Sequence, residues 1–324
     1  SLQFLPMDHL QSLPSVSPQA AAIALASLGA YALTKLAQWL VPGPQHRVRF
    51  DFKDKTVLIT GASAGLGKEI ARELYRRGAR LILVARSIDK LKEVVEELKA
   101  EDAQGAVRYE PVYCYLDLAD PEKVEDLAKL SHNGKIDCLV NNAGISMRGS
   151  VMDTDMKVQR QVMEVNFFGQ VTVTRALLPF IPDDGCIVLI SSLQSKMPIP
   201  YRSAYSASKH AVVAFFDSLR CEERFGLHIM NVVAGYINTN LGSHALDTSG
   251  KPMGAAAIES SADQLTGMAP EVVAKMVADG VEQRKLEITP APFKHRIGIF
   301  LRWLWPSLYF FLVHKRGLKD RKKE

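Results

Sequence analysis

Residues 55–67 read KTVLITGASAGLG, and the expected fold of the chain follows from this stretch. Its first part, 55–60, is a short apolar run with β-branched residues, which predicts a buried strand. Three glycines come next at the spacing G-x-x-x-G-x-G, and residues 68–77 then predict a helix. A strand, a glycine turn and a helix in this order direct backbone N–H groups and a helix N-terminus at an anion. The stretch therefore predicts a dinucleotide-binding turn at the start of a Rossmann-type domain.

The same glycines also match a competing motif. Gly61, Ser63 and Gly65 fit G-x-S-x-G, the turn that exposes the nucleophilic serine of α/β-hydrolases between a strand and a helix. In this chain the motif follows the first strand of the domain, which is early for such a serine, and it gives Gly67 no role. Nucleotide binding is therefore favoured, and a serine hydrolase acting through Ser63 is the alternative.

Strand and helix patterns alternate along the chain as far as residue 290. Further strands are expected at 80–85, 112–116, 136–140, 186–190, 228–233 and 286–289, and helices at 88–101, 121–130, 155–180, 203–224 and 269–282. Such alternation predicts an α/β fold with a doubly wound, mostly parallel sheet. We expect a single dinucleotide-binding catalytic domain at 46–290, a lead and apolar segment at 1–45, and an apolar and basic segment at 291–324. The stretch 234–268 is rich in small and polar residues and is expected to form a loop over the substrate.

The end of the second predicted strand indicates which nucleotide is bound. A site for NAD usually has an acidic residue there, which binds the ribose 2′-hydroxyl. Here Ala85 is followed by Arg86, and a guanidinium group pairs well with a 2′-phosphate. Arg86 therefore predicts NADP(H). Asp117, after the third strand, has two open interpretations: it bonds the adenine amino group, or it caps the turn before Pro121.

A catalytic pair is expected on the helix at 203–224. Tyr205 and Lys209 are four residues apart and so share one face of that helix. A nearby ammonium favours the phenolate and lowers the pKa of the phenol, which suits proton transfer to or from a carbonyl or hydroxyl oxygen. Ser192 follows the preceding strand, at the edge of the sheet where ligands bind in this fold. Asn166 lies inside a predicted helix, where it either bends the helix and holds a water or is exposed.

Composition argues against several kinds of site. The net charge is +5, and the stretch 315–324, with six Lys/Arg and two acids, carries +4 of it. This indicates a local basic tail and no nucleic-acid-binding face. The four cysteines have no paired spacing and predict neither a disulfide framework nor a metal site.

Two apolar segments flank the predicted domain. Residues 20–41 are mostly apolar and long enough to cross a bilayer, so they predict a membrane anchor, with an amphipathic or buried helix as the alternative. Residues 293–313 are aromatic and apolar, but they contain Arg302 and Pro306, which argues against a second span. They predict either an interfacial helix beside anionic lipids, or a helix that covers the substrate cleft or packs in a dimer.

Together these motifs resemble those of the short-chain dehydrogenase/reductase family. The matching residues, within 52–290, are Thr60-Gly61-x-x-x-Gly65-x-Gly67, Asn141-Asn142-Ala143-Gly144, Asn166, Ser192 and Tyr205-x-x-x-Lys209. Other stretches, among them 194–200 and 235–241, are similar to a membrane-anchored group of that family. Two residues depart from the family pattern: Ala234 stands where a proline is usual, and Ala64 stands where some NADPH-preferring members have a basic residue.

The resemblance implies a role for each matched residue. Tyr205 would be the general acid in reduction and the base in oxidation, and Lys209 would lower its pKa and bond the nicotinamide ribose. Ser192 would hold the substrate oxygen, Asn166 a water that links Lys209 to solvent, and Thr239 the carboxamide. The other cofactor-binding residues would be Gly61, Ser63, Gly65, Leu66, Gly67, Arg86, Asp117 and Asn142, and no metal is implied.

The resemblance further implies an NADPH-dependent carbonyl reductase or alcohol dehydrogenase. Its substrate would be a lipophilic ketone or secondary alcohol: an acyl- or alkyl-dihydroxyacetone phosphate, a steroid or a retinoid. The endoplasmic reticulum membrane is the expected location, with a peroxisomal or lipid-droplet membrane as the alternative, and a homodimer is compatible with the family. A nucleotide-binding scaffold without turnover is the remaining alternative to an enzyme.

Overall fold

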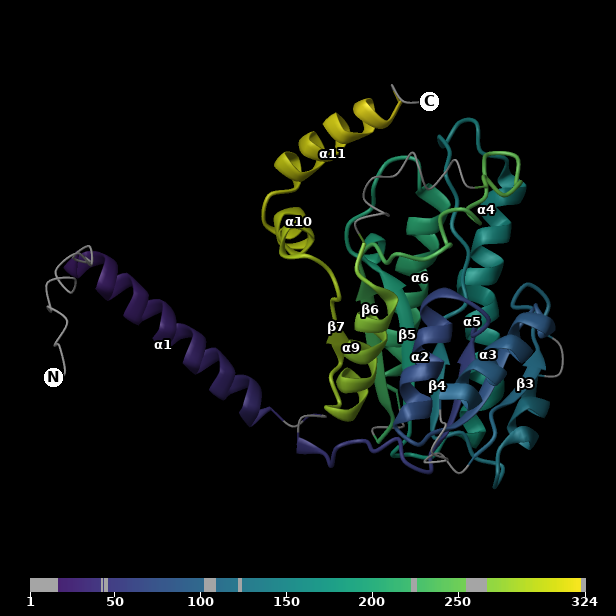
Figure 1. Cartoon of the computed structure of the whole chain (residues 1–324). Coiled ribbons are helices and arrows are strands. Elements are labelled where there is room, and N and C mark those ends of the chain that lie inside the picture. The colour runs from purple at the N-terminus through teal and green to yellow at the C-terminus, as the bar shows by residue number, and fades with distance from the viewer. Residues whose placement is uncertain are drawn as a thin grey trace, which may run out of the picture. The chain divides into compact units, whose positions relative to one another are not determined.

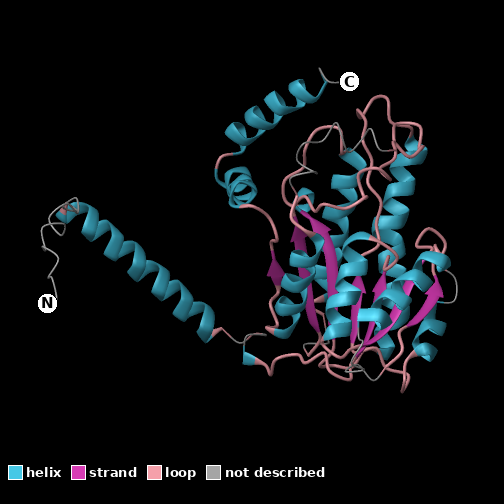
Figure 2. Ribbon diagram, in the orientation of Figure 1, coloured by secondary structure: helices cyan, strands magenta, loops and turns pink. Residues whose placement is uncertain are grey.

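Seven parallel strands form one sheet in the order β3-β2-β1-β4-β5-β6-β7 (Figures 1 and 2). In the computed structural model the strands are β1 (Thr56–Thr60), β2 (Arg80–Ala85), β3 (Val112–Tyr115), β4 (Cys138–Asn141), β5 (Cys186–Ser192), β6 (His228–Ala234) and β7 (Glu287–Ile288). Every neighbouring pair is parallel. The doubly wound Rossmann fold expected from the sequence is therefore confirmed.

The structure describes residues 17–41, 43, 46–101, 109–121, 124–222, 226–254 and 267–321, with side chains as far as residue 318. The chain divides into two units, Ser1–Arg47 and Val48–Glu324. The first part of the predicted lead, the end of the basic tail and residues 255–266 of the expected substrate loop lie outside the described residues.

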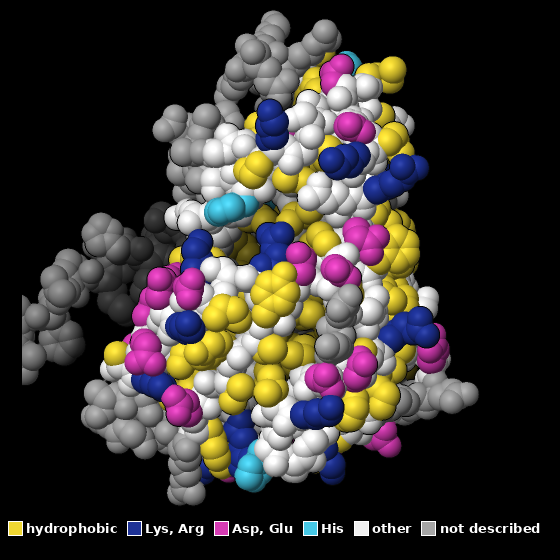
Figure 3. Space-filling model, turned by 90° about the vertical axis from the view of Figure 1, so that its right-hand side faces the viewer, with side chains coloured by type: hydrophobic (Ala, Val, Ile, Leu, Met, Phe, Trp, Pro, Cys, Tyr) yellow, Lys and Arg dark blue, Asp and Glu magenta, His cyan; other side chains and the backbone are white. Residues whose placement is uncertain are grey.

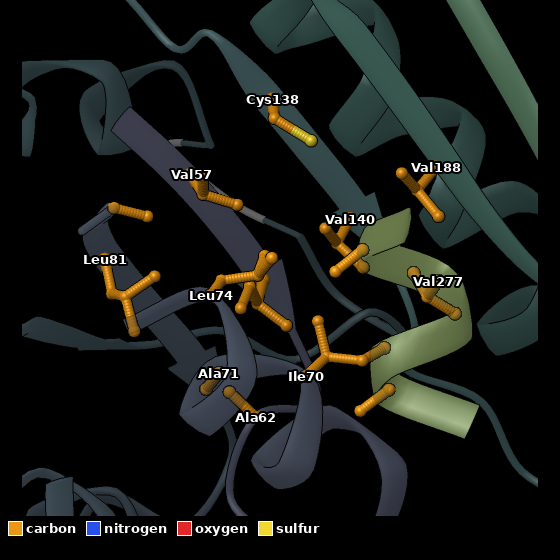
Figure 4. Close-up of a cluster of buried hydrophobic side chains, with 14 of the residues drawn as sticks. Val57, Ala62, Ile70, Ala71, Leu74, Leu81, Cys138, Val140, Val188 and Val277 are labelled. Atoms are coloured by element: carbon orange, nitrogen blue, oxygen red, sulfur yellow. The ribbon is translucent and has the colours of Figure 1, made fainter. Parts of the chain in front are cut away.

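Helices cover both faces of the sheet. One face carries α2 (Gly65–Arg76), α3 (Ile88–Glu101) and α9 (Pro270–Glu282), whose apolar side chains form one buried cluster with the strands. Figure 4 shows part of that cluster, in which Ile70, Leu74 and Val277 lie beside Val57 and Val140. The other face carries η3 (Val124–Leu130), α5 (Gly169–Leu177), η5 (Leu178–Phe180) and α6 (Ser203–Leu219) around a second cluster, while the buried side chains of α4 (Met156–Met163) form a third cluster with Ala204 and Tyr205. The five central strands, from β2 to β6 in the sheet order, are almost entirely buried and read as continuous apolar runs, which is why the sequence revealed them.

The helix predicted at 155–180 is interrupted in the structure. A π-turn, η4 (Glu164–Phe168), separates α4 from α5, and Asn166 lies inside it. Asn166 is fully buried, so the interpretation in which it is an exposed helix residue is wrong. π-turns inside α-helices often mark functional sites, because the extra residue changes the direction of nearby groups.

The C-terminal segment forms two helices, α10 (Phe293–Leu304) and α11 (Pro306–Arg321). Arg302 Nε donates to Lys196 O at 3.0 Å, and the buried Tyr309 hydroxyl donates to Pro198 O at 2.8 Å. These contacts attach both helices to the segment that follows η6 (Leu193–Ser195) and leads into α6. The outer side of the two helices exposes large apolar side chains: Phe293, Ile297, Phe300, Trp303, Leu304, Trp305, Phe310, Phe311, Leu312 and Leu318.

The N-terminal unit contains one long helix, α1 (Pro18–Leu40). Ser17 caps it by accepting a hydrogen bond from Ala20 N, and Pro18 occupies the first helical position, where no backbone N–H is needed. None of its side chains is buried. Among the described residues, α1 is the one helix that is long and apolar enough to cross a membrane.

Candidate active site

The glycine turn between β1 and α2 can form only with glycine at its tightest points. Gly61 has φ +66°, in the left-handed region that favours glycine. A Cβ on Gly67 would lie 2.3 Å from Gly61 O and 2.4 Å from Asn142 Nδ2, far inside contact distance. The Asn142 amide in turn donates to Thr60 O at 2.9 Å and to Gly61 O at 3.2 Å. Asn142 therefore holds the turn against the end of β4.

A cavity of about 520 Å³ lies along the carboxyl ends of the strands. It is lined by all the predicted site residues except Asn166, namely Gly61, Ser63, Gly65, Leu66, Gly67, Arg86, Asp117, Asn142, Ser192, Tyr205, Lys209 and Thr239. Figure 3 shows the face on the side of β3, where the surface is hollowed and Lys and Arg side chains border the hollow. The parallel sheet thus brings residues from seven segments of the chain to one edge.

Two charged residues mark the end of the cavity beside β2 and β3. Arg86 directly follows β2 and is exposed at the cavity wall, as is Lys90 in α3, which the sequence reasoning missed. Asp117 Oδ1 accepts a hydrogen bond from Ala119 N at 2.9 Å, so it does cap its turn, and it also lines the cavity. The two interpretations of Asp117 are therefore compatible.

Lys209 places an ammonium group in the interior. Its side chain is 4% exposed, and Nζ donates to Ile190 O at 3.0 Å. Burial lowers the pKa of Lys209 to about 8. The charge of Lys209 is consequently present at neutral pH and is lost a little above it.

Tyr205 lies one helical turn before Lys209, and the Lys209 Nζ is 5.8 Å from the centre of its ring. Burial raises the pKa of the Tyr205 hydroxyl, and a hydrogen bond with Ser192 and the charge of Arg202 act in the opposite direction. The sequence reasoning expected Lys209 to lower this pKa; among the residues described, the cation with that effect is Arg202. The Tyr205 hydroxyl therefore keeps its proton at neutral pH.

Asn166 supports this pair from outside the cavity. Its Oδ1 accepts from Ile145 N at 2.8 Å, and its Nδ2 donates to Ile145 O at 2.8 Å and to Ser208 Oγ at 3.0 Å. A Cβ built on Gly144 would meet both Asn166 Oδ1, at 3.0 Å, and Lys209 Nζ, at 3.6 Å. Asn166 thus fixes the turn after β4 against Lys209.

Ser63 lacks the setting of a hydrolase nucleophile. It lines the cavity, but within the described ranges its hydroxyl makes no hydrogen bond to a histidine. Activation of a serine needs such a base within hydrogen-bond reach. The geometry therefore does not favour a reaction through Ser63.

Several cavity residues were not found from the sequence. They are Arg148, Arg202, Tyr236, His244, His295 and Arg316. Arg202 comes three residues before Tyr205 and could have been placed on the same side of the helix. Arg316 comes from α11, more than a hundred residues away from Tyr205, and no local pattern indicates that it reaches the cavity.

Comparison with known families and curated proteins agrees with this geometry. The family model described as short chain dehydrogenase matches residues 55–249. A Danio rerio protein named Dehydrogenase/reductase SDR family member 7B is 42% identical over 93% of this chain and 96% of its own length. A Drosophila melanogaster protein named Dehydrogenase/reductase SDR family protein 7-like is 40% identical over 86% of this chain and 85% of its own.

Solved structures show the same fold. An alcohol dehydrogenase from Thermococcus sibiricus, complexed with 5-hydroxy-NADP, has a TM-score of 0.60 and 27% identity, over 73% of this chain and 96% of its own. A short chain dehydrogenase from Burkholderia cenocepacia in complex with NADP has a TM-score of 0.61 and 26% identity, over 74% of this chain and 98% of its own. A short chain dehydrogenase/reductase from Burkholderia phymatum in complex with NAD has a TM-score of 0.69 and 23% identity, over 80% of this chain and 96% of its own.

The buried charge of Lys209 predicts a variant that is more stable than the natural protein. The difference between a pKa of about 8 and the ordinary 10.5 corresponds to about 3 kcal/mol. Lys209→Met removes this cost and loses one hydrogen bond worth about 1 kcal/mol, so the free energy of unfolding without ligand should rise by about 2 kcal/mol at pH 7. Because the lowered pKa belongs to the folded state, the cost is complete below pH 8, shrinks from pH 8 to 10.5, and disappears above that.

Thermal unfolding at pH 7 and at pH 10.5 measures this difference. The gain in melting temperature should be present at pH 7 and replaced by a small loss at pH 10.5, where only the lost hydrogen bond remains, while Lys157→Met, at an exposed position in α4, should change neither value. A Lys209→Met variant that is less stable than the natural protein at pH 7 would contradict the assigned cost.

Proposed function

Since this chain belongs to the short-chain dehydrogenase/reductase family, we propose that it is an NADP(H)-dependent carbonyl reductase that acts on a lipophilic ketone, or on the secondary alcohol in reverse. The observation that carries the proposal is the buried Tyr205 hydroxyl, which is bonded to Ser192 and has the Lys209 ammonium on the same helix. The glycine turn of β1 and α2 lines the other end of the same cavity. A proton donor and a nucleotide-binding turn in one cavity fit the transfer of a hydride and a proton to a carbonyl.

The cavity wall fits a nicotinamide dinucleotide. Because Gly61 and Gly67 have no side chains, the backbone of the turn is accessible at the start of α2, and a helix N-terminus binds a pyrophosphate favourably. The buried Ser191 Oγ, also in the wall, has no hydrogen-bond partner among the described residues, so it is available to a ligand. Arg86 and Lys90 supply positive charge beside the ribose end, which supports NADP(H) over NAD(H). Two structures with 26–27% identity contain NADP or a derivative of it.

The proposed roles of the residues follow from their contacts. NADPH, when bound, supplies the hydride to the carbonyl carbon. Tyr205 keeps its proton at neutral pH and donates it to the carbonyl oxygen, while Ser192 holds that oxygen in place. Lys209 is proposed to bond the nicotinamide ribose, and Thr239, which packs on Gly65, borders the cofactor. The contacts of Asn166 with Ile145 and Ser208 support a role in positioning these parts of the site. We propose that Asn166 also holds the water that links Lys209 to solvent.

A membrane surface is the proposed place of action. The exposed apolar helix α1 is suited to an anchor, and the outer side of α10 and α11 adds an aromatic surface of the kind that enters a lipid interface. A lipophilic substrate, such as an acyl- or alkyl-dihydroxyacetone phosphate, a steroid or a retinoid, would be supplied by that membrane. We propose the endoplasmic reticulum, with peroxisomal and lipid-droplet membranes as alternatives.

Tyr205→Phe tests the reaction. The substitution removes one hydroxyl, so turnover of a long-chain ketone with NADPH should fall between about 100-fold and 10,000-fold, because a general acid is lost. Binding of NADPH, measured by fluorescence titration, should change less than threefold. Tyr201→Phe is the matched control, since Tyr201 does not line this cavity, and it should retain full turnover. A Tyr205→Phe enzyme with more than a tenth of the natural activity would refute the assignment.

Arg86→Asp tests the cofactor. The change replaces a partner of the 2′-phosphate with a group that repels it and that accepts from a ribose hydroxyl. The ratio of kcat/KM for NADPH to that for NADH should fall roughly 100-fold. Lys92→Gln, in the next turn of α3 and outside the cavity, should leave the ratio unchanged. An unchanged ratio in the Arg86→Asp variant would show that Arg86 does not bind the 2′-phosphate.

Extraction of membranes with alkaline carbonate tests the anchor. The whole chain should remain in the pellet, whereas a chain without residues 1–45 should be released by carbonate. In neutral buffer the shortened chain should still sediment with the membranes, because α10 and α11 keep their apolar surface. Release of the whole chain by carbonate would reject an integral span.

A further inference from the structure

Arg202 lies at the start of the helix that carries Tyr205. It is the residue immediately before α6, and its backbone carbonyl accepts a hydrogen bond from Ser206 N at 2.8 Å. Tyr205 follows three residues later, in the first turn of the helix. The side chains of both residues line the cavity, and Arg202 is half-buried there. The proton transfer proposed above does not use Arg202.

Met147 joins the side chains of Arg202 and Tyr205. Arg202 Nη1 donates to Met147 O at 3.3 Å. The side chain of Met147 is fully buried and belongs to the same apolar cluster as Tyr205. One residue of the segment after β4 therefore holds the guanidinium group and packs in one cluster with the tyrosine.

The positive charge of Arg202 is not neutralised by a carboxylate. In the part of the chain that the structure describes, Arg202 makes no ion pair and no side-chain hydrogen bond other than the one to Met147. Burial, together with the charges of Arg148 and Arg316, lowers the pKa of Arg202 to about 10, so the group is still charged at neutral pH. A guanidinium group has five N–H donors, and the bond to Met147 uses one of them. The charge is therefore available to act on the groups that face it.

One of those groups is the Tyr205 hydroxyl. The other ionisable groups near these two side chains come from separate elements: Arg148 after β4, Lys209 in α6, Tyr236 after β6 and Arg316 in α11. Tyr236 raises the pKa of the Tyr205 hydroxyl, and the charge of Arg202 lowers it. Among the described groups, Arg202 is thus the cation that favours the deprotonated form of Tyr205.

We propose that Arg202 stabilises the phenolate that Tyr205 becomes when its proton passes to the carbonyl oxygen, and so acts in the reaction through Tyr205. A neutral phenol turns into an anion in a largely buried position, which is costly unless a cation lies close by. In the reverse direction the same cation favours the phenolate that takes the proton from the alcohol. The inference rests on the proposed reductase function and assigns to Arg202 the effect that the sequence predicted for Lys209.

Two substitutions separate the charge of Arg202 from its contact with Met147. Arg202→Gln keeps an N–H donor for the Met147 carbonyl but removes the charge, and Arg202→Lys keeps the charge on a different side chain. Arg175→Gln is the matched control, because Arg175 is exposed on α5 and does not line the cavity. A purely structural role predicts that none of the three changes shifts the pH dependence of the reaction.

The pH dependence of alcohol oxidation tests the inference. Because Tyr205 must be deprotonated to act as the base, kcat/KM for a long-chain secondary alcohol with NADP should rise with pH. Between about pH 6 and 9, where Arg202 is charged, this rise should move about one pH unit higher in Arg202→Gln. In ketone reduction at pH 7, kcat should fall about tenfold while KM changes less than threefold. Arg202→Lys should restore most of the loss, and Arg175→Gln should match the natural enzyme.

Nitration by tetranitromethane tests the same effect without turnover. The reagent is uncharged and attacks phenolates, so its rate at Tyr205 near pH 8.5, read by mass spectrometry, follows the deprotonated fraction. In Arg202→Gln, Tyr205 should be nitrated about tenfold more slowly, relative to the exposed Tyr115 of the same chain. Glutamine is smaller than arginine and opens the access to Tyr205, so a slower reaction cannot result from shielding.

The two measurements distinguish failure of this inference from failure of the proposed function. An unmoved pH profile, or equal nitration of Tyr205 in Arg202→Gln, would overturn the inference and leave the reductase function standing. A raised KM with unchanged kcat would also overturn it, because Arg202 would then act on substrate binding. Slower nitration in a protein that reduces no ketone would contradict the proposed function, while the action of Arg202 on Tyr205 would stand.

Discussion

The Lys209 ammonium lies beneath the end of β5, and its hydrogen bond to the Ile190 carbonyl is the contact on which the geometry of the site depends. An ammonium group in the interior needs an acceptor there, and the sheet supplies one only where a strand carbonyl faces the helix. Once Lys209 is held, Tyr205 one turn earlier comes to the side chain of Ser192, two residues beyond Ile190. The helix and the strand are thereby fixed at the one point where a carbonyl substrate would meet a proton donor.

The strand order explains how distant residues meet at that point. β4 and β5 are neighbours in the sheet, and the glycine turn follows β1, which pairs with β4. The turn, the Asn142 brace and Ser192 therefore end at the same edge, although they are spread over some 130 residues. Asn166, which lies in the π-turn, adds a second brace, because its side chain makes hydrogen bonds with Ile145 and Ser208.

Much of this was predictable from the sequence because its signals are local. Buried strands leave continuous apolar runs, the glycine turn has a spacing set by sterics, and Tyr205 with Lys209 shares one helical face. What was not predictable depends on tertiary contacts. The π-turn has no propensity signal, Lys90 looks like any surface lysine, and Arg148 and Arg316 reach the cavity only through the packing of segments far apart in the chain. From the sequence, the charge of Lys209 was expected to lower the pKa of Tyr205, whereas in the structure burial of the hydroxyl raises it.

The C-terminal helices unite two properties that the sequence presented as alternatives. One side of α10 and α11 packs on residues 196–200 beside the cavity, and the other side exposes aromatic residues. A segment with these two sides can border a substrate cavity and face a lipid surface at once. In the proposed function, the substrate would therefore pass from the membrane to Tyr205 along these helices.

Transfer of isotope from cofactor to substrate is the measurement that tests the central proposal most directly. The full chain in detergent is incubated with a long-chain ketone and NADPH that carries deuterium at both C4 positions of the nicotinamide, and the alcohol is examined by mass spectrometry. A reductase with Tyr205 as its acid predicts one deuterium on the carbinol carbon and a solvent-derived proton on the oxygen. An alcohol without deuterium, or no alcohol above the level formed by Tyr205→Phe, would contradict it.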